Sequence, residues 1–275
     1  MPGVDGMRAV PMERPGKPEA VLRVLDARSG GQVEVGTGHR SPLRVFVQGA
    51  RTGAAEEPSG LRARLVADVL LRTAELHGGQ ALLGLVRSGG TRETPEARAA
   101  VLGIRPPAAS GTPEEIAQAL GGRAHVYVTA GQETAEQGVT VRVGAVRPYE
   151  QPSPIGLDAL ALRLALLTHP HHEPVALTPD ELAAAQRTLE RWRRSVADWA
   201  RAPSKPMCAE ALGRALAGLE ADLDVPVVLD ALNRLESEAG LPDGSKFEMF
   251  TYLDRVLALE LTREIGHAAS YDPLT

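Results

Sequence analysis

In the first half of the chain, apolar residues occur in short runs that alternate with polar positions, which is the pattern of β-strands. Such runs predict strands at 20–26, 31–35, 43–48, 81–87, 124–129 and 139–146. Helical spacing predicts helices at 60–77 and 111–122, and Thr112 and Glu115 form a capping box at the start of the second. Because strand, helix and strand follow one another over 43–87, we expect a parallel pair with a right-handed crossover.

In the second half, apolar residues recur every three or four positions, which predicts helices throughout. These helices are expected at 156–169, 178–202, 208–223, 225–240 and 246–266. The second of them opens with Thr178, Pro179 and Glu181, another capping box. The segment 147–154, "RPYEQPSP", has the composition of a linker.

These patterns divide the chain into three parts. Residues 1–19, rich in Pro and Gly, are expected to form a flexible lead-in. Residues 20–150 are expected to form an α/β domain with a parallel sheet. Residues 151–275 are expected to form a bundle of helices.

The composition is that of an ordinary globular protein, with 275 residues, 43% of them hydrophobic and 24% charged. A net charge of −5 provides no overall attraction to nucleic acid or anionic lipid. No apolar run is long enough to cross a bilayer and the first residues do not resemble a signal peptide, so we expect no membrane association and a cytoplasmic location. Cys208 is the only cysteine, which excludes an internal disulfide and a cysteine-rich zinc site, and we interpret it as a small apolar filler.

The stretch from 45 to 72 reads strand, glycine turn, loop and helix, as many nucleotide-binding α/β folds begin. The usual nucleotide signals are missing from it. Between Lys17 and Lys205 there is no lysine, so a phosphate-binding loop with its lysine cannot exist there. "GTGHRS" lacks the third glycine and the strand context of a dinucleotide fingerprint, and no nucleophile elbow occurs.

The segment "THPHHEP" brings together His169, His171 and His172. Imidazoles are common metal ligands, but the sequence places no carboxylate or cysteine partner beside them. We therefore favour a polar loop between two helices over a metal site.

Two tryptophans, Trp192 and Trp199, are seven residues apart on one predicted helix and share a face. Packing against the bundle is favoured over base stacking. The arginines around them are Arg191, Arg193, Arg194 and Arg201. An ordinary solvated helix face is favoured over an RNA-binding patch for these arginines.

Five segments, in this order, resemble cysteinyl-tRNA synthetase and the mycothiol-pathway ligase that joins cysteine to an aminosugar. They are 22–35, 45–72, 102–129, 156–193 and 215–235. The fourth, which begins "GLDALALRLALLTHPHHEP", resembles the family's Asp-Pro-x-Ala-Leu-Arg helix, its histidine-containing turn and the long helix after it. The resemblance implies a truncated Rossmann-like sheet of the class I synthetase type, followed by an all-α bundle.

The chain departs from this family at the positions that carry its chemistry. Gln48 stands where the family has a zinc-binding cysteine, and Glu57-Pro58-Ser59-Gly60 stands where it has a His-Ile-Gly-His motif. A glutamate there would repel the phosphates of ATP. The lysine-rich loop expected just before Gly156 is absent, and so is almost all of the second half of the nucleotide fold. We therefore expect no catalytic residues and no zinc, and ATP binding only if the pocket is retained.

What remains of the pocket is a set of eight candidate ligand-binding positions. They are Gln48, Gly49, Arg51, Glu57, Ser59, Gly60, Arg62 and Asp68. The favoured hypothesis is a non-catalytic paralogue that binds a protein partner, a second copy of itself or a small ligand. The alternative is an adenylate-forming cysteine ligase with altered chemistry, acting on tRNA or an aminosugar. Its anionic ligand would meet arginines such as Arg44, Arg51, Arg62 and Arg64. Binding of tRNA alone is disfavoured by the acidic balance.

Overall fold

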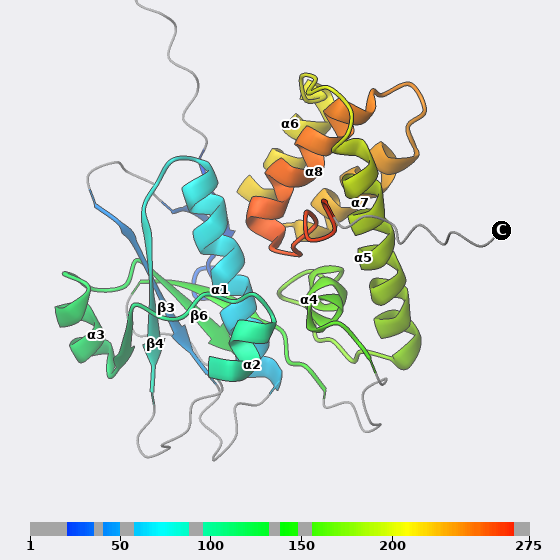
Figure 1. Ribbon diagram of the computed structural model, residues 1–275. Coiled ribbons are helices and arrows are strands. Elements are labelled where there is room, and N and C mark those ends of the chain that lie inside the picture. Colours follow the sequence, from blue (N-terminus) through cyan, green and yellow to red (C-terminus); the bar gives the residue numbers. More distant parts are fainter. Residues whose placement is uncertain are drawn as a thin grey trace, which may run out of the picture.

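The computed structural model describes residues 21–35, 41–49, 58–87, 96–131, 138–147 and 156–266 (Figure 1). The predicted lead-in, nearly all of the predicted linker, and the candidate positions Arg51 and Glu57 lie outside these residues. No described helix has both the length and the apolar character that crossing a membrane requires.

The first half forms a parallel sheet of five strands in the order β5-β4-β3-β6-β7. Its strands are β3 (Leu43–Gln48), β4 (Ala81–Val86), β5 (Ala109–Gly111), β6 (Val126–Ala130) and β7 (Val139–Val143). The central strand β3 is buried along most of its length, as expected of a strand covered on both faces. The predicted parallel pairing of 43–48 with 81–87 is confirmed, with Leu43 opposite Ala81 and Gln48 opposite Val86.

A separate antiparallel hairpin of β1 (Arg23–Leu25) and β2 (Gln32–Glu34) precedes the sheet. Its turn uses Gly30 at a φ of +71°, a conformation that favours glycine. The Ala27 amide donates to the carbonyl of Thr140, and Asp26 accepts from the amide of Thr140. The hairpin therefore covers part of the outer edge of β7, which would otherwise be an open edge.

Helix α1 (Pro58–Leu76) lies between the sheet and the helical half (Figure 1). It contacts β3, β4 and β6 on one side and α8 on the other. Most of its side chains are buried, including charged ones, which is unusual for a helix of a small domain. The short helices α2 (Glu96–Val101) and α3 (Pro113–Ala119) complete the α/β domain.

The second half is a bundle of helices, as predicted. Its members are α4 (Ala159–Leu167), α5 (Pro179–Trp199), α6 (Ala209–Glu220), α7 (Val225–Ser237) and α8 (Asp243–Leu257). Both predicted capping boxes form, at Thr112 and at Thr178. The buried apolar residues of the two halves make one continuous core.

Some predicted boundaries are wrong. The last helix ends at Leu257 rather than 266, because Ala258 takes a left-handed conformation and Asp254 accepts the amides of Leu259 and Leu261. Strand β5 and helix α2 were not predicted, since neither has an apolar period of its own.

Candidate functional site

The carboxyl ends of β3 and β6 are where a parallel sheet of this kind usually binds a ligand, because the strand order reverses there. Gln48 ends β3 opposite Thr129 of β6, and Gly49 follows it. A Cβ on Gly49 would meet nothing within 4 Å, so this point has space around it. Helix α1 begins with Pro58.

Ser59 and Arg62, in the first turns of α1, are held by the chain that follows β7. The Ser59 hydroxyl accepts the amide of Val146 at 3.0 Å. The buried Arg62 guanidinium donates to the carbonyls of Gly144 at 3.1 Å and Pro170 at 2.9 Å, and to that of Glu173. Burial lowers the pKa of Arg62 to about 10, against the opposing charge of Glu173, so the group stays charged at neutral pH.

This coverage depends on a close approach of two backbone segments. A Cβ on Gly144 would lie 2.1 Å from the carbonyl oxygen of Glu173, so only glycine fits at that position. The Gly144 amide also donates to the carbonyl of His171 at 2.9 Å. The first turns of α1, including the buried Gly60, are thus covered by residues 144–146 and 170–173.

Asp68, another candidate position, is fully buried in a group of arginines. It accepts Arg72 at 2.8 Å, Arg163 at 2.9 Å and Arg105 at 3.1 Å. Burial by itself would raise the pKa of Asp68, but the charges and hydrogen bonds of Arg163 and Arg72 outweigh it and hold the pKa below its usual value. Arg163 also donates to the carbonyls of Leu102 and Leu257, so the group joins α1, α4 and the end of α8.

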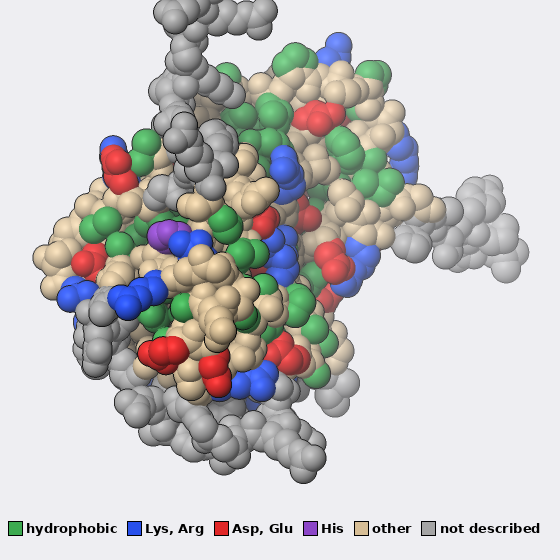
Figure 2. All heavy atoms as spheres, turned by 90° about the vertical axis from the view of Figure 1, so that its left-hand side faces the viewer, with side chains coloured by type: hydrophobic (Ala, Val, Ile, Leu, Met, Phe, Trp, Pro, Cys, Tyr) green, Lys and Arg blue, Asp and Glu red, His purple; other side chains and the backbone are tan. Residues whose placement is uncertain are grey.

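The other arginines of the ligase hypothesis point in different directions. Arg44, near the amino end of β3, donates to the carbonyl of Arg123 at 2.8 Å. Arg64 is buried and pairs with Glu96 at 2.8 Å. On the face of the α/β domain shown in Figure 2, acidic and basic side chains are interspersed with apolar ones.

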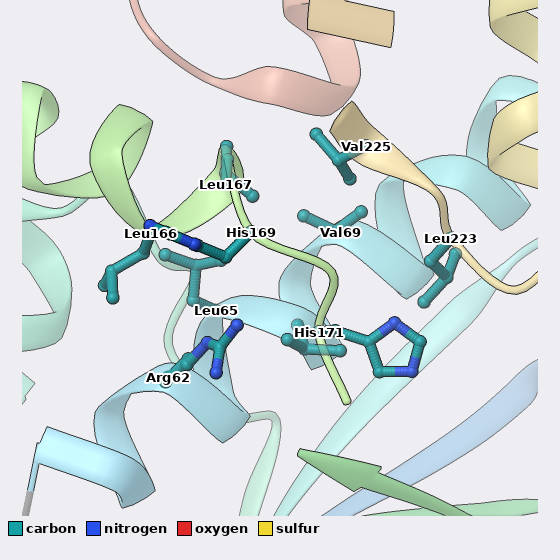
Figure 3. Close-up of a pocket in the computed structure, with 10 residues that line it drawn as sticks. Arg62, Leu65, Val69, Leu166, Leu167, His169, His171, Leu223 and Val225 are labelled. Atoms are coloured by element: carbon teal, nitrogen blue, oxygen red, sulfur yellow. The ribbon is translucent and has the colours of Figure 1, made fainter. Parts of the chain in front are cut away.

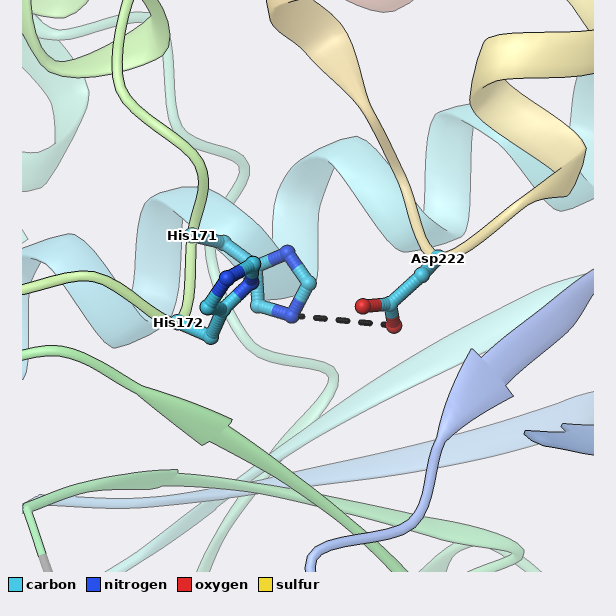
Figure 4. Close-up of side chains that lie close together, drawn as sticks. All are labelled: His171, His172 and Asp222. Carbon is cyan, nitrogen blue, oxygen red and sulfur yellow. Dashed lines mark ion pairs between the residues drawn. The ribbon is translucent and has the colours of Figure 1, made fainter. Parts of the chain in front are cut away.

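The histidine cluster lies in the loop between α4 and α5. His171 is a buried residue of this loop, and its ring packs edge to face on that of His172, with 5.4 Å between the ring centroids. Asp222, from the turn between α6 and α7, approaches the pair, with its Oδ1 3.8 Å from Nε2 of His171 (Figure 4). His169 points elsewhere, toward Glu181 at 3.8 Å.

The preference for a plain polar loop rested on the lack of a carboxylate partner. The fold supplies one, because one ligand atom from each of His171, His172 and Asp222 lies within 4.8 Å of the others. Burial lowers the pKa of His171 to about 4, with Arg62 and His172 acting in the same direction and Asp222 and Asp224 against it. Its ring is therefore neutral at neutral pH.

A small, mainly apolar cavity lies beside these groups, between α1, α4 and the α6–α7 turn (Figure 3). Its lining residues include Arg62, Leu65, Leu166, His171, Leu223 and Val225. The guanidinium of Arg62 and the ring of His171 border this cavity.

The tryptophan prediction is confirmed. Trp192 and Trp199 both pack edge to face on Phe250, at 5.7 and 5.1 Å between centroids. The prediction of a solvated face is wrong for one of the neighbouring arginines. Arg193 is buried and pairs with Asp158 at 2.6 Å. Cys208 is half-buried and precedes the first turn of α6 without capping it.

No family model matches this chain. Several curated cysteine ligases match part of it, all with the name L-cysteine:1D-myo-inositol 2-amino-2-deoxy-alpha-D-glucopyranoside ligase. The ligase of Gordonia bronchialis is 40% identical over 78 residues, which is 28% of this chain and 18% of the relative. That of Streptosporangium roseum is 33% identical over 108 residues, 38% of this chain and 26% of the relative. That of Thermomonospora curvata is 34% identical over 84 residues, 30% of this chain and 19% of the relative.

In part, this chain is similar to cysteine ligases. The matched segments span about a quarter or less of the length of these relatives. The resemblance to the synthetase-like family is thus supported, while the truncated and degenerate state inferred from the motifs stays a prediction.

Two described positions of the candidate pocket bear on the zinc and the ATP that the resemblance implies. The zinc would need a cysteine where Gln48 stands, and a glutamine amide is not a usual zinc ligand. The phosphates of ATP need hydrogen-bond donors, and Nη1 and Nη2 of Arg62 already donate to main-chain carbonyls.

Proposed function

We propose that this chain is a relative of the cysteine ligases that forms no adenylate and acts instead by binding, as a regulatory protein or as a subunit for a protein partner. The observation that carries this proposal is that the side chains of Ser59 and Arg62 are already hydrogen-bonded to main-chain groups of the protein. Both come from the part of α1 that would face a nucleotide, and both are bonded to the backbone that follows β7.

The sequence supports the same conclusion. Adenylate formation needs positive groups on the phosphates of ATP as charge develops there. The chain has Glu57-Pro58-Ser59-Gly60 at the position of the family's histidine motif and no lysine between Lys17 and Lys205. Both motifs that would supply these positive groups, and the preorganised cradle they form, are therefore absent from the sequence.

The direct test is pyrophosphate exchange with ATP and L-cysteine, with a full-length cysteine ligase as the positive control. We expect no exchange above background. Thermal unfolding with a non-hydrolysable cysteinyl-adenylate analogue supplies a second measurement. A ligand at a hundred times its Kd stabilises by about 2.7 kcal/mol, which moves the Tm of a chain of this size by several degrees. We expect no shift at millimolar analogue, and a shift with exchange would refute the proposal.

The alternative is a cysteine ligase with altered chemistry, and the partial identity with ligases of 33 to 40% favours keeping it. It predicts release of AMP when ATP and L-cysteine are supplied with an aminosugar acceptor or tRNA. Measuring AMP with each acceptor separates this function from binding alone, because a binding protein releases none with either.

A further inference from the structure

We propose that His171, His172 and Asp222 form a site for a divalent transition-metal ion of the zinc class. Two imidazole nitrogens and a carboxylate oxygen are a donor set that suits such ions. The three ligand atoms come from two segments far apart in the sequence, and all lie within 4.8 Å of one another. Its ligands do not include Gln48, which stands where the resembled family has its zinc-binding cysteine.

The spacing of the groups fits an ion better than a direct contact. Nε2 of His171 and Oδ1 of Asp222 are 3.8 Å apart, too far for a hydrogen bond. Ligands bound at about 2.0–2.2 Å around a tetrahedral zinc are roughly 3.5 Å from one another. His172 is exposed, so its ring can turn to complete the set at little cost.

The backbone holds both segments in place without the ion. On the loop side, the Gly144 amide donates to the carbonyl of His171, and Arg62 donates to the carbonyl of Pro170 at 2.9 Å. On the other side, the Asp222 amide donates to the carbonyl of Arg23 at 2.8 Å. The ligands are therefore preorganised, and binding need not order a mobile loop.

The carboxylate is also oriented. The Leu25 amide donates to Oδ1 of Asp222 at 2.7 Å, which occupies one of the carboxylate's lone-pair positions and leaves others for an ion. Such outer partners fix the direction of a metal ligand. Asp222 has a φ of +59°, a conformation that the turn after α6 imposes on it.

The charges around the site are compatible with a cation. Asp222 and Asp224 face His171 with negative charge, and Arg62 faces it with positive charge. Asp222 is itself one of the ligands, and Asp224 adds a second negative charge that would favour a bound cation. Three protein ligands on a partly exposed site leave a fourth position for water, as in exchangeable zinc sites.

Binding would join the α4–α5 loop to the α6–α7 turn and, through Leu25, to the hairpin. The test uses the full chain without a polyhistidine tag, stripped with EDTA and dialysed. Calorimetric titration with Zn²⁺ is expected to give one ion per chain, and Co²⁺ is expected to show the visible absorption of a cobalt ion of low coordination number. The Tm is expected to rise with Zn²⁺ concentration, because the unfolded chain lacks the assembled site.

Two ligand variants and one control assign the site. His172→Ala removes an exposed side chain, so it tests the metal without disturbing the core. Asp222→Asn keeps an oxygen for the Leu25 amide and removes the charge. Each is expected to weaken Zn²⁺ binding by about 10-fold or more. His169→Ala removes a neighbouring imidazole that faces Glu181 and is expected to leave the affinity unchanged.

Three results would overturn the proposal. The first is the absence of saturable binding, which would leave a bridging water between His171 and Asp222. The second is binding that survives both ligand variants. The third is an equal loss in His169→Ala, which would mean that the loss of Zn²⁺ binding is not specific to the three proposed ligands.

Discussion

Among the buried charged groups of helix α1 are Arg62, near its start, and Asp68, less than two turns later, and their surroundings differ. Arg62 has no carboxylate within hydrogen-bonding distance among the described residues, and donates to three main-chain carbonyls. Asp68 is surrounded by Arg72, Arg105 and Arg163. Arg62 holds the segment after β7 and the loop between α4 and α5 against α1. Asp68 joins α1 to α4 of the helical bundle.

The difference shows what each group contributes. A guanidinium bonded to carbonyls satisfies polar groups that would otherwise be buried without partners. A carboxylate among arginines instead cancels charge, and its removal leaves cations in the core. Removing Asp68 should therefore lower the free energy of unfolding more than removing Arg62, although the sequence predicted both as ligand-binding positions.

The largest effect is expected for Asp68→Ala. Arg163, which is fully buried, would lose its carboxylate, at a cost of about 3–5 kcal/mol in the free energy of unfolding. Urea unfolding at neutral pH measures it. Asp68→Leu combined with Arg163→Met should recover part of the loss, since an apolar pair replaces the uncompensated charge while the carbonyls of Leu102 and Leu257 lose their donor. A double variant no more stable than Asp68→Ala would contradict this account.

A smaller effect is expected for Arg62→Met, which keeps the apolar stem and removes the donors. Three buried carbonyls would lose a partner, so we expect a loss of about 2–3 kcal/mol in urea unfolding. Arg62→Lys should recover only part of it, because an ammonium cannot reproduce the planar fork. Arg214→Met on the exposed side of α6 is the matched control and should change stability by less than about 0.5 kcal/mol. A similar loss in both variants would mean that the carbonyl contacts do not matter.

Asp158 extends the comparison to a partly exposed carboxylate, because it pairs with Arg193 at 2.6 Å and Arg263 at 2.9 Å. Burial alone would raise the pKa of Asp158, but the hydrogen bonds and charges of these partners hold it below 3.8. The stabilisation is therefore present above pH 3.8 and is lost as the pH falls through the lower folded value.

Asp158→Asn keeps an oxygen to cap α4 at the Leu160 amide and removes the charge. We expect a loss of about 1 kcal/mol at pH 7, reduced because the carboxylate is partly exposed to solvent. The difference between variant and parent should shrink when unfolding is repeated near the acid end of the accessible range. A difference that is the same at both pH values would show that the charge contributes nothing.

The smallest effect is expected for Arg234→Ala on α7, whose partner Asp230 lies 2.8 Å away with both side chains exposed. Water screens such pairs, so the coupling measured with Asp230→Ala in a double-mutant cycle should be about 0.3–0.5 kcal/mol. If this coupling energy were as large as that between Asp68 and Arg163, burial would not explain the order of the predicted stability losses.

Local signals predicted much of this fold. The two capping boxes formed because each needs only residues three positions apart. Strand β5 was missed because Ala109–Gly111 has no apolar alternation and becomes a strand through pairing with β4. The candidate positions Ser59, Arg62 and Asp68 were chosen from a resemblance, and nothing near them in the sequence indicated their partners.

By itself, the sequence determined the order and type of most elements, the lack of a phosphate-binding lysine, and the packing face of Trp192 and Trp199. Only the tertiary structure brought Asp222 beside His171, and Asp68 beside Arg163. The physical reason is that apolar periodicity tells which face of a helix is buried. Which polar group that face then meets depends on how distant segments pack against it.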